Sequence, residues 1–310
     1  MARLHEAART AVQHLACLGN SAEVGTLSLV SGRTETEIHS VLEEAVRAEL
    51  IERRENSYRF IHDRIQEAAY SLVPESLRAA EHLRIGRLLA MHTPPEKREE
   101  AIFEIVNQLN RGATLITSPE EREHLAEFNL TAAKRAKAAS AYAPALTYLI
   151  TSGTVLPEDA WDRCHRLVLE IEINRAECEF LTADLAAAEE RLSMLSRRAG
   201  NLVDKAAVAC LRTAVYTTLY RSVRAVEICL EYLHEAGIAW SPHPTDDEIR
   251  EEYNRLWLQL GGRPIEALFD LPLMSDPDCR ATMEVLTEIV APAYFSDANL
   301  WCLACCGWRT

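Results

Sequence analysis

The spacing of apolar residues is the feature that most restricts the fold of this chain. Between residues 181 and 199 the apolar side chains recur in alternating steps of four and three, and residues 223–233 repeat the pattern. Such steps place apolar residues on one face of an α-helix, whereas a half-buried strand would need strict alternation. Only 11 of the 310 residues are glycine, which argues against a sheet fold with glycine-rich turns. The sequence therefore predicts a mainly α-helical protein.

The first 74 residues predict a small winged-helix domain. The expected elements, in order, are helices over residues 7–18, 23–30 and 34–48 and extended stretches over 50–54 and 58–61. Thr34 and Glu37 have the spacing of a capping box, in which each side chain accepts a hydrogen bond from the other residue's backbone amide. Three short helices followed by a hairpin is the order of elements in a winged helix.

The rest of the chain predicts paired helices. Residues 75–140 are expected to form a helical hairpin region, with helices over 75–92 and 98–111 and a third that starts at a Ser118–Glu121 capping box. Residues 141–310 are expected to form an irregular tetratricopeptide-like α-solenoid, truncated at its C-terminus. Its half-repeats, residues 141–149, 182–192 and 221–229, align on Ala145, Ala188 and Ala225, which lie 43 and 37 residues apart.

Charge and cysteine content limit the partners and the compartment. With 33 basic and 47 acidic residues the formal net charge is −14, which repels nucleic acids and anionic membranes. Residues 34–49, which contain the expected third helix, carry five glutamates against Arg47, so a DNA-binding role for this helix is unfavourable. Nine cysteines, mostly single within helical patterns, indicate free thiols in the cytoplasm. We find no signal peptide and no apolar run long enough to cross a bilayer.

Three strings carry a resemblance to a known family: Ala16–Asn20 (ACLGN), Leu42–Ile51 (LEEAVRAELI) and Tyr58–Pro74 (YRFIHDRIQEAAYSLVP). They resemble the segment after the ATPase module of large bacterial signalling proteins. Those proteins combine a serine/threonine kinase, a switch (AAA-type, STAND) ATPase, helical repeats, a GAF sensor and a sensor histidine kinase. The resemblance extends to about residue 300, including Ser241–Arg250 and Pro264–Pro277. It implies a middle segment of such a protein, namely a post-ATPase winged helix plus tetratricopeptide-like repeats.

The resemblance singles out His62. The pair His62-Asp63 looks like the His-Asp pair in the winged-helix domain of switch ATPases, where the histidine approaches the phosphates of ADP. The pattern departs at Ile61, where a methionine is common in eukaryotic relatives. An imidazole N–H can donate to a phosphate oxygen, so His62 is our candidate nucleotide-state sensor, acting only with the missing ATPase domain. The structural alternative is that Asp63 caps a helix and His62 is a half-buried core residue.

Signals for catalysis are absent from the sequence. It contains neither a phosphate-binding G-x-x-x-x-G-K-[ST] loop nor the His-Arg-Asp and Asp-Phe-Gly motifs of a protein kinase. The cluster Cys302, Cys305 and Cys306 lacks a further ligand pair for zinc. Cys164 and His165 are adjacent on an expected helix, so their side chains point about 100° apart and do not form a dyad. We therefore expect no enzyme, no metal and no cofactor in this chain, with ATP or ADP bound only by the parent protein.

These observations predict a non-catalytic regulatory or scaffolding segment. It would couple an upstream ATPase to downstream sensor or kinase domains through protein–protein contacts, without nucleic acid or membrane. The alternative is a transcription regulator with a DNA-binding winged helix and a ligand-binding solenoid. Both ends of the sequence look cut from a larger protein, and the last ten residues look like an artefact of reading frame or truncation.

Overall fold

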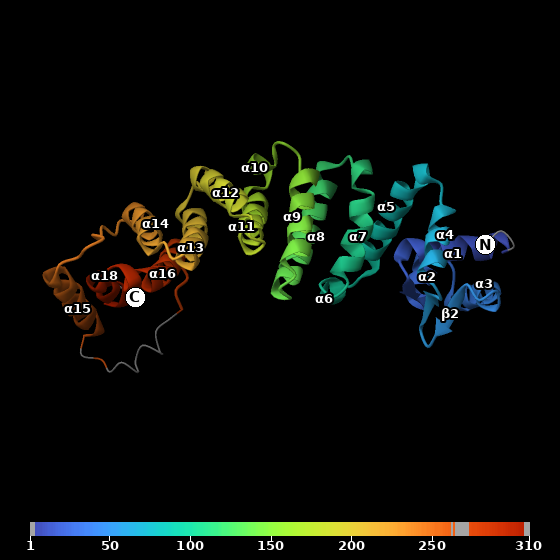
Figure 1. Cartoon of the computed structure of the whole chain (residues 1–310), viewed down its shortest axis with the longest axis horizontal. Coiled ribbons are helices and arrows are strands. Elements are labelled where there is room, and N and C mark those ends of the chain that lie inside the picture. The colour runs from blue at the N-terminus through green and yellow to red at the C-terminus, as the bar shows by residue number, and fades with distance from the viewer. Residues whose placement is uncertain (1–3, 262, 264–272, 307–310) are drawn as a thin grey trace. The chain divides into compact units, whose positions relative to one another are not determined.

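The computed structural model describes residues 4–261, 263 and 273–306, and helices make up 75% of these described residues. The prediction of a mainly α-helical fold is confirmed, and a small sheet accompanies the helices (Figure 1). The chain divides into two compact units, Met1–His165 and Arg166–Thr310. Residues 264–272, part of the string Pro264–Pro277 used for the resemblance, and residues 307–310 at the expected artefact lie outside the described residues.

The first unit contains one small sheet and a series of helices. Its elements are α1 (Glu6–Leu18), β1 (Ser21–Glu23), α2 (Val24–Ser31), α3 (Glu35–Arg47), β2 (Ile51–Arg54), β3 (Ser57–Phe60), α4 (Asp63–Ser71), α5 (Glu75–His92), α6 (Pro95–Arg98), α7 (Ile102–Arg111), a 3₁₀ turn (Ala113–Leu115), α8 (Pro119–Ala138), α9 (Tyr142–Val155) and α10 (Ala160–Arg163).

Helices α1 to α3 and the three strands surround one apolar core. Leu15, Ile38, Leu42, Tyr58 and Phe60 are all buried in it. The capping box at the start of α3 is present as predicted, and the hairpin forms from β2 and β3. A third strand, β1, pairs antiparallel with β3, so the sheet order is β1-β3-β2. Sequence analysis missed β1, because three residues are too few to show an alternating pattern.

The helices from α5 to α9 follow the sequence prediction with two differences. The helix expected over 98–111 starts only at Ile102, because Pro95 opens the separate short helix α6. At α8 the Ser118 side chain caps the Glu121 amide as predicted. The reciprocal half of that capping box is absent, because the Glu121 carboxylate pairs with Arg87 on α5 at 2.7 Å.

Every regular element in the described part of the second unit is a helix. Its elements are α11 (His165–Leu181), α12 (Leu185–Arg198), α13 (Leu202–Thr218), α14 (Ser222–Glu235), α15 (Asp246–Leu260), α16 (Pro277–Glu288), α17 (Val290–Ser296) and α18 (Ala298–Cys306). Its core lies between α13, α14 and the last three helices, around Cys229, Leu233, Val285 and Leu300.

Three helix–helix joints share one backbone conformation. They follow α8, α11 and α13, and each contains a non-glycine residue in the left-handed region, with φ of 59° at Ser140, 66° at Ala183 and 58° at Tyr220. The next residue in each joint donates its amide to a carbonyl five residues earlier, at 2.8–2.9 Å. This bond closes the end of each first helix. The buried alanine used to align the half-repeats lies five residues after each left-handed residue.

Among the described residues, no helix combines the length and the apolar content that crossing a bilayer requires.

Candidate functional site

His62 is the N-cap residue of α4. Its Nδ1 accepts a hydrogen bond from the backbone amide of Arg64 at 3.2 Å, and its side chain is exposed. An accepting Nδ1 leaves the proton of a neutral imidazole on Nε2, which has no protein partner within the described part of the chain. The ring therefore presents a donor to the outside. The structural alternative is wrong in both particulars, because the cap is His62 rather than Asp63 and His62 is not half-buried.

Helix α4 also carries Tyr70, which enters a buried chain of polar groups. The Tyr70 hydroxyl lies 2.9 Å from Nε2 of His82 on α5, and His82 Nδ1 lies 2.6 Å from Oε1 of Gln108 on α7. Gln108 Nε2 then donates to the backbone carbonyl of Cys17 at the end of α1, at 2.8 Å. His82 and Gln108 are 1% and 5% exposed. One chain of hydrogen bonds thus joins α4, α5, α7 and α1.

The direction of every hydrogen bond from Tyr70 to Cys17 follows from the acceptor at the end, the Cys17 carbonyl. The Cys17 carbonyl can only accept, so the amide NH₂ of Gln108 faces it and Gln108 Oε1 faces His82. His82 Nδ1 is then the donor, and in a neutral ring Nε2 accepts the hydrogen of Tyr70. Each buried polar group has its partner in this arrangement. A buried chain that is fully satisfied in one direction fixes the positions of its members.

A close contact between α5 and α7 sets the His82–Gln108 distance. Gly86 lies one turn after His82 and packs against Leu109, the neighbour of Gln108. A Cβ at Gly86 would come within 2.6 Å of the Leu109 side chain and 2.9 Å of its backbone nitrogen. The absence of a side chain at Gly86 therefore allows the two helices to approach until His82 and Gln108 bond.

A second polar arm joins α5 to α1 and α2. His14 on α1 lies 2.9 Å from the Ser31 hydroxyl and 3.4 Å from a carboxylate oxygen of Glu81. Glu81 also pairs with Arg84 at 2.6 Å, and Arg84 donates to the Val30 carbonyl at 3.0 Å. Side chains of α5 thus contact both α1 and α2.

Burial sets the protonation of both histidines. Burial lowers the pKa of His82, against the opposite effect of its bond to Gln108, while Arg111 adds to the lowering. Burial also lowers the pKa of His14, although the Glu81 carboxylate acts in the other direction. The hydrogen bond from Arg84 lowers the pKa of Glu81. Both imidazoles are therefore neutral at pH 7, and for His82 this agrees with the bond directions given above.

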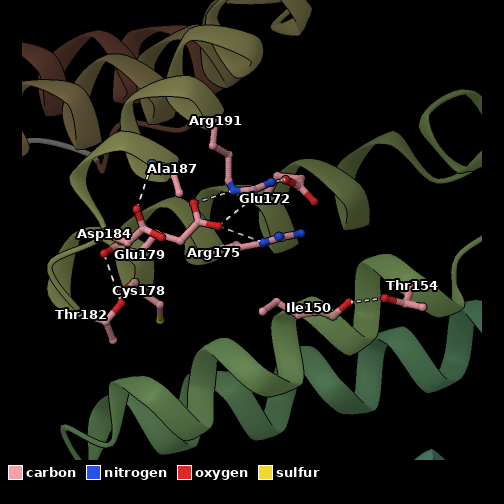
Figure 2. A network of polar contacts seen from close by, with 10 residues as sticks. All are labelled: Ile150, Thr154, Glu172, Arg175, Cys178, Glu179, Thr182, Asp184, Ala187 and Arg191. Atoms are coloured by element: carbon pink, nitrogen blue, oxygen red, sulfur yellow. Dashed lines mark hydrogen bonds and ion pairs between the residues drawn. The ribbon is translucent and has the colours of Figure 1, made fainter.

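The second unit contains a compact ion-pair network on α11 and α12. Figure 2 shows Arg191 of α12 reaching Glu172 and Glu179 of α11, and Arg175 contacting Glu179 at 3.1 Å. The side chains of Glu179 and Glu172 are 5% and 12% exposed, and that of Arg191 is 16% exposed. Burial alone would lower the pKa of Arg191, but the two carboxylates outweigh it and raise that pKa. The network holds the two helices of this pair together.

The other sequence candidates lie in two places. The helix expected to contain both Cys164 and His165 is wrong, because Cys164 lies in a bend after α10 and His165 begins α11. Cys302, Cys305 and Cys306 are on α18, and the described residues contain no group of three metal-ligating side chains. Cys164 Sγ lies 3.3 Å from the Ala160 carbonyl, and the His165 ring packs at 5.6 Å from that of Trp161.

The buried networks were not found from the sequence. A usable signal existed, because His82 and Gln108 are polar residues at positions where the helical pattern expects an apolar side chain. Gln108 lies between Ile105, Val106 and Leu109, which are all buried. What the pattern lacked was the partner, since Gln108 and Cys17 are 91 residues apart.

Comparisons with known proteins point to signalling. Hybrid signal transduction histidine kinase G of Dictyostelium discoideum is 26% identical to this chain over 237 residues, which cover 69% of the chain and 7% of that protein. No family model and no solved structure matches the sequence. The chain thus spans less than a tenth of the length of this relative. Most of it is similar to a segment of a signal-transduction kinase, and that part of the expected resemblance is confirmed.

Proposed function

We propose that this chain is a non-catalytic connector in a signal-transduction protein, coupling an upstream switch ATPase to downstream sensor or kinase domains. The similarity to a histidine kinase segment supports the signalling context. The element order α1-β1-α2-α3-β2-β3 with sheet order β1-β3-β2 suits a winged helix. The three equivalent joints at Ser140, Ala183 and Tyr220 suit tetratricopeptide-like repeats, in which one supersecondary unit recurs.

The observation that carries this proposal is the path that begins at His62. His62 caps α4, and Tyr70 lies eight residues later, about 12 Å along the helix axis. A shift of α4 would pull the Tyr70 hydroxyl from His82 and leave buried polar groups without partners, which costs about 1–3 kcal/mol per group. Movement of α4 is therefore coupled to α5 and α7. A ligand that binds His62 in one state would bias the packing of these helices.

The ligand we propose for His62 is a phosphate oxygen of ADP held by an ATPase domain outside this chain. The outward Nε2–H of His62 is the group that would donate to it. In this proposal the chain acts in the cytoplasm, has no cofactor of its own, and has protein domains as partners rather than nucleic acid or membrane.

A first experiment tests the non-catalytic part of this proposal. Isothermal titration calorimetry of this chain with ATP and magnesium is expected to give no binding in the micromolar range, and a phosphate-release assay no hydrolysis. The reason is that the sequence supplies no loop of backbone amides to hold the phosphates. Micromolar affinity would contradict the assignment of the nucleotide to another domain.

A second experiment tests the coupling. In the full-length gene product, Gln108→Leu removes the bonds to His82 and Cys17 while keeping a side chain of similar size. We expect the dependence of autophosphorylation on ADP and ATP to fall at least about fivefold, the lower range of allosteric coupling. Gln259→Leu, the same change on the exposed face of α15, serves as the control. An unchanged nucleotide dependence in a folded Gln108→Leu variant would refute the connector path.

The alternative of a DNA-binding regulator has less support. Helix α3, which would enter the major groove, exposes Glu35, Glu37 and Glu43, and its Arg47 is paired with Glu43 at 2.8 Å. A helix with this charge repels phosphates. Fluorescence anisotropy with a labelled DNA duplex at low salt separates the two functions, since salt-dependent binding would favour the regulator.

A further inference from the structure

A pocket of about 300 Å³ lies in the second unit between α12 and α13. Its apolar lining comes from both helices and from the end of α11, and it includes Phe180, Leu185, Leu192, Val215 and Leu219. Arg221 and Arg224, at the start of α14, also line it. A cavity of this size accepts a large apolar side chain or a small ligand.

The charges around this pocket differ from those of the chain as a whole. Its lining carries three arginines, Arg212, Arg221 and Arg224, against one carboxylate, Glu189. The whole sequence has a net charge of −14. Because Arg224 is paired with Glu227 and Glu231, the local positive charge comes from Arg212 and Arg221, and it favours an anionic partner on an otherwise acidic protein.

Two of these arginines have no carboxylate partner in the described part of the chain. Arg212 donates to the Ser196 hydroxyl at 3.2 Å, and Arg221 is exposed. By contrast, Arg224 pairs with Glu227 and Glu231, as Arg175 and Arg191 do with glutamates on α11. In a chain so rich in acids, Arg212 and Arg221 therefore keep their charge available to an external carboxylate.

Glu189, the one carboxylate of the pocket lining, already has a hydrogen-bond partner within the protein. The Tyr216 hydroxyl donates to Glu189 Oε1 at 2.6 Å, and this bond raises the pKa of Tyr216. The bond fixes one wall of the pocket between α12 and α13. Glu189 is in this way directed toward Tyr216.

Exposed apolar side chains lie at the rim of the pocket and next to its arginines in the sequence. Leu185 on its rim is 44% exposed, and Tyr220, which precedes Arg221 in the chain, is 95% exposed. Val223, one residue before Arg224, is 64% exposed. A small molecule inside the pocket would leave the exposed part of Leu185 in water, whereas a longer segment of a protein would cover it.

We propose that this pocket and its rim bind an acidic peptide segment of a partner protein. An apolar side chain of the peptide, leucine or an aromatic residue, fills the pocket over Leu192 and Val215, and a neighbouring Asp or Glu bonds to Arg212 and Arg221. This inference deepens the proposed connector function by naming the chemistry of its partner, and it rests on that function only for the biological context.

A peptide-display experiment tests the proposal. A random dodecapeptide phage library is panned on this chain, and enriched sequences are made as fluorescein-labelled peptides for anisotropy titration. We expect enrichment of peptides in which Asp or Glu lies next to Leu, Phe or Trp. Arg212→Glu and Arg221→Glu should each weaken binding at least about tenfold, because a charge-assisted bond becomes a repulsion. Arg250→Glu, the same change at an exposed arginine on α15, should leave binding unchanged.

Several results would overturn this inference. They are enrichment no greater than on an uncoated surface, enrichment of basic peptides, or full binding by both Arg→Glu variants. Self-association of the chain in light scattering that both variants abolish would make a second copy the occupant instead. Circular dichroism melting shows whether the variants are folded, and Arg221→Gln provides a milder change at an exposed position. The Gln108→Leu experiment concerns the first unit, so either proposal can fail while the other stands.

Discussion

Tyr70 donates its hydroxyl hydrogen to Nε2 of His82 across 2.9 Å, and this bond joins α4 to α5 within a buried chain of polar groups. The acceptor is fixed, because His82 Nδ1 must donate to Gln108 and Gln108 must donate to the Cys17 carbonyl. The bond therefore has one direction and one geometry. The bond helps to hold α4 and α5, which Pro74 separates in the sequence, in a defined relation, beside the Arg78 guanidinium that lies 4.9 Å from the centre of the Tyr70 ring.

Removing that hydroxyl should destabilise the first unit. Tyr70→Phe keeps the ring but leaves the buried His82 Nε2 without a donor, so we expect a loss of about 1–3 kcal/mol in the free energy of unfolding. Urea denaturation followed by circular dichroism measures it. Tyr220→Phe, the same change at a side chain that is 95% exposed, should have an effect near zero. Equal stabilities of the two variants would show that the bond contributes nothing.

The buried histidines should make the chain less stable in mild acid. The pKa values of His82 and His14 are lower in the folded protein than in the unfolded chain, where a histidine has a pKa of about 6.5. Below pH 6.5 the unfolded state therefore binds more protons, and stability falls as pH decreases. Each histidine can contribute up to about 1.4 kcal/mol per pH unit.

Urea midpoints between pH 7.5 and pH 5.5 provide the measurement. The variant His82→Gln should lose less stability over this range than the wild-type chain, because one of the two groups no longer titrates. Parallel curves for the two proteins would show that His82 is not protonated on unfolding in this range. His92→Gln, at an exposed histidine of the same helix, is the matched control for the substitution itself.

Sequence reasoning succeeded where structure depends on neighbours along the chain. The capping box of Thr34 and Glu37 and the start of α8 after Ser118 could be predicted because the bonded groups lie three residues apart. Strand β1 was missed because Ser21–Glu23 forms it only by pairing with β3, 36 residues later at the Ala22–Tyr58 pair. The predicted bond from the Ser118 amide to the Glu121 side chain was wrong for the same reason, since the Glu121 carboxylate pairs with Arg87 of α5.

For the candidate site too, contacts between residues far apart in the sequence could not be predicted. His62 could be singled out by its resemblance to a family motif, and its exposure agrees with a role at the surface. The sequence predicted Asp63 as the N-cap of this helix, because aspartate is a common N-cap, whereas His62 caps it through the Arg64 amide. The hydrogen bonds from Tyr70 to Cys17 form only when α1, α4, α5 and α7 are packed together. The ion pairs of Arg191 form only when α12 folds back on α11. No spacing in the sequence specifies such partners.

Arg191 should be among the most important polar side chains of the second unit. Arg191→Met keeps the aliphatic stem and removes the charge that Glu172 and Glu179 share, while Glu179 retains Arg175. Because a largely buried carboxylate is left unpaired, we expect a loss of about 3 kcal/mol in the free energy of unfolding. Guanidinium denaturation measures this, with Arg250→Met as the control.

The control removes an ion pair of a different kind. The side chains of Arg250 and Asp247 are 70% and 86% exposed, so their pair should contribute less than about 1 kcal/mol. A loss at Arg191 no larger than at Arg250 would mean that water screens the network shown in Figure 2.

Gly86 should not tolerate a methyl group. Alanine improves helix propensity by about 1 kcal/mol, but its Cβ would lie 2.9 Å from the Leu109 backbone nitrogen, and the two helices would have to separate. Overpacking of this kind costs about 1–3 kcal/mol, and the stretched His82–Gln108 bond adds to it. We expect a net loss of about 1–2 kcal/mol for Gly86→Ala in urea denaturation. Gly200→Ala, where no atom lies within 4 Å of the new Cβ, should be neutral or slightly stabilising.

The two roles of His62, helix cap and proposed phosphate donor, can be separated by two substitutions. Asparagine is a good N-cap, so His62→Asn should keep the bond to the Arg64 amide and the stability of this chain, whereas His62→Ala should lose about 0.5–1 kcal/mol. Neither variant retains the imidazole Nε2–H. If that group donates to ADP, both should release ADP from the full-length gene product, because loss of a bond of about 1.5–3 kcal/mol in one state shifts the balance roughly ten- to a hundredfold toward the open form. The measurements are urea denaturation of this chain and ADP retention after desalting of the full-length protein. Normal ADP retention by His62→Asn, together with a stability loss in His62→Ala alone, would leave His62 as a helix cap and nothing more.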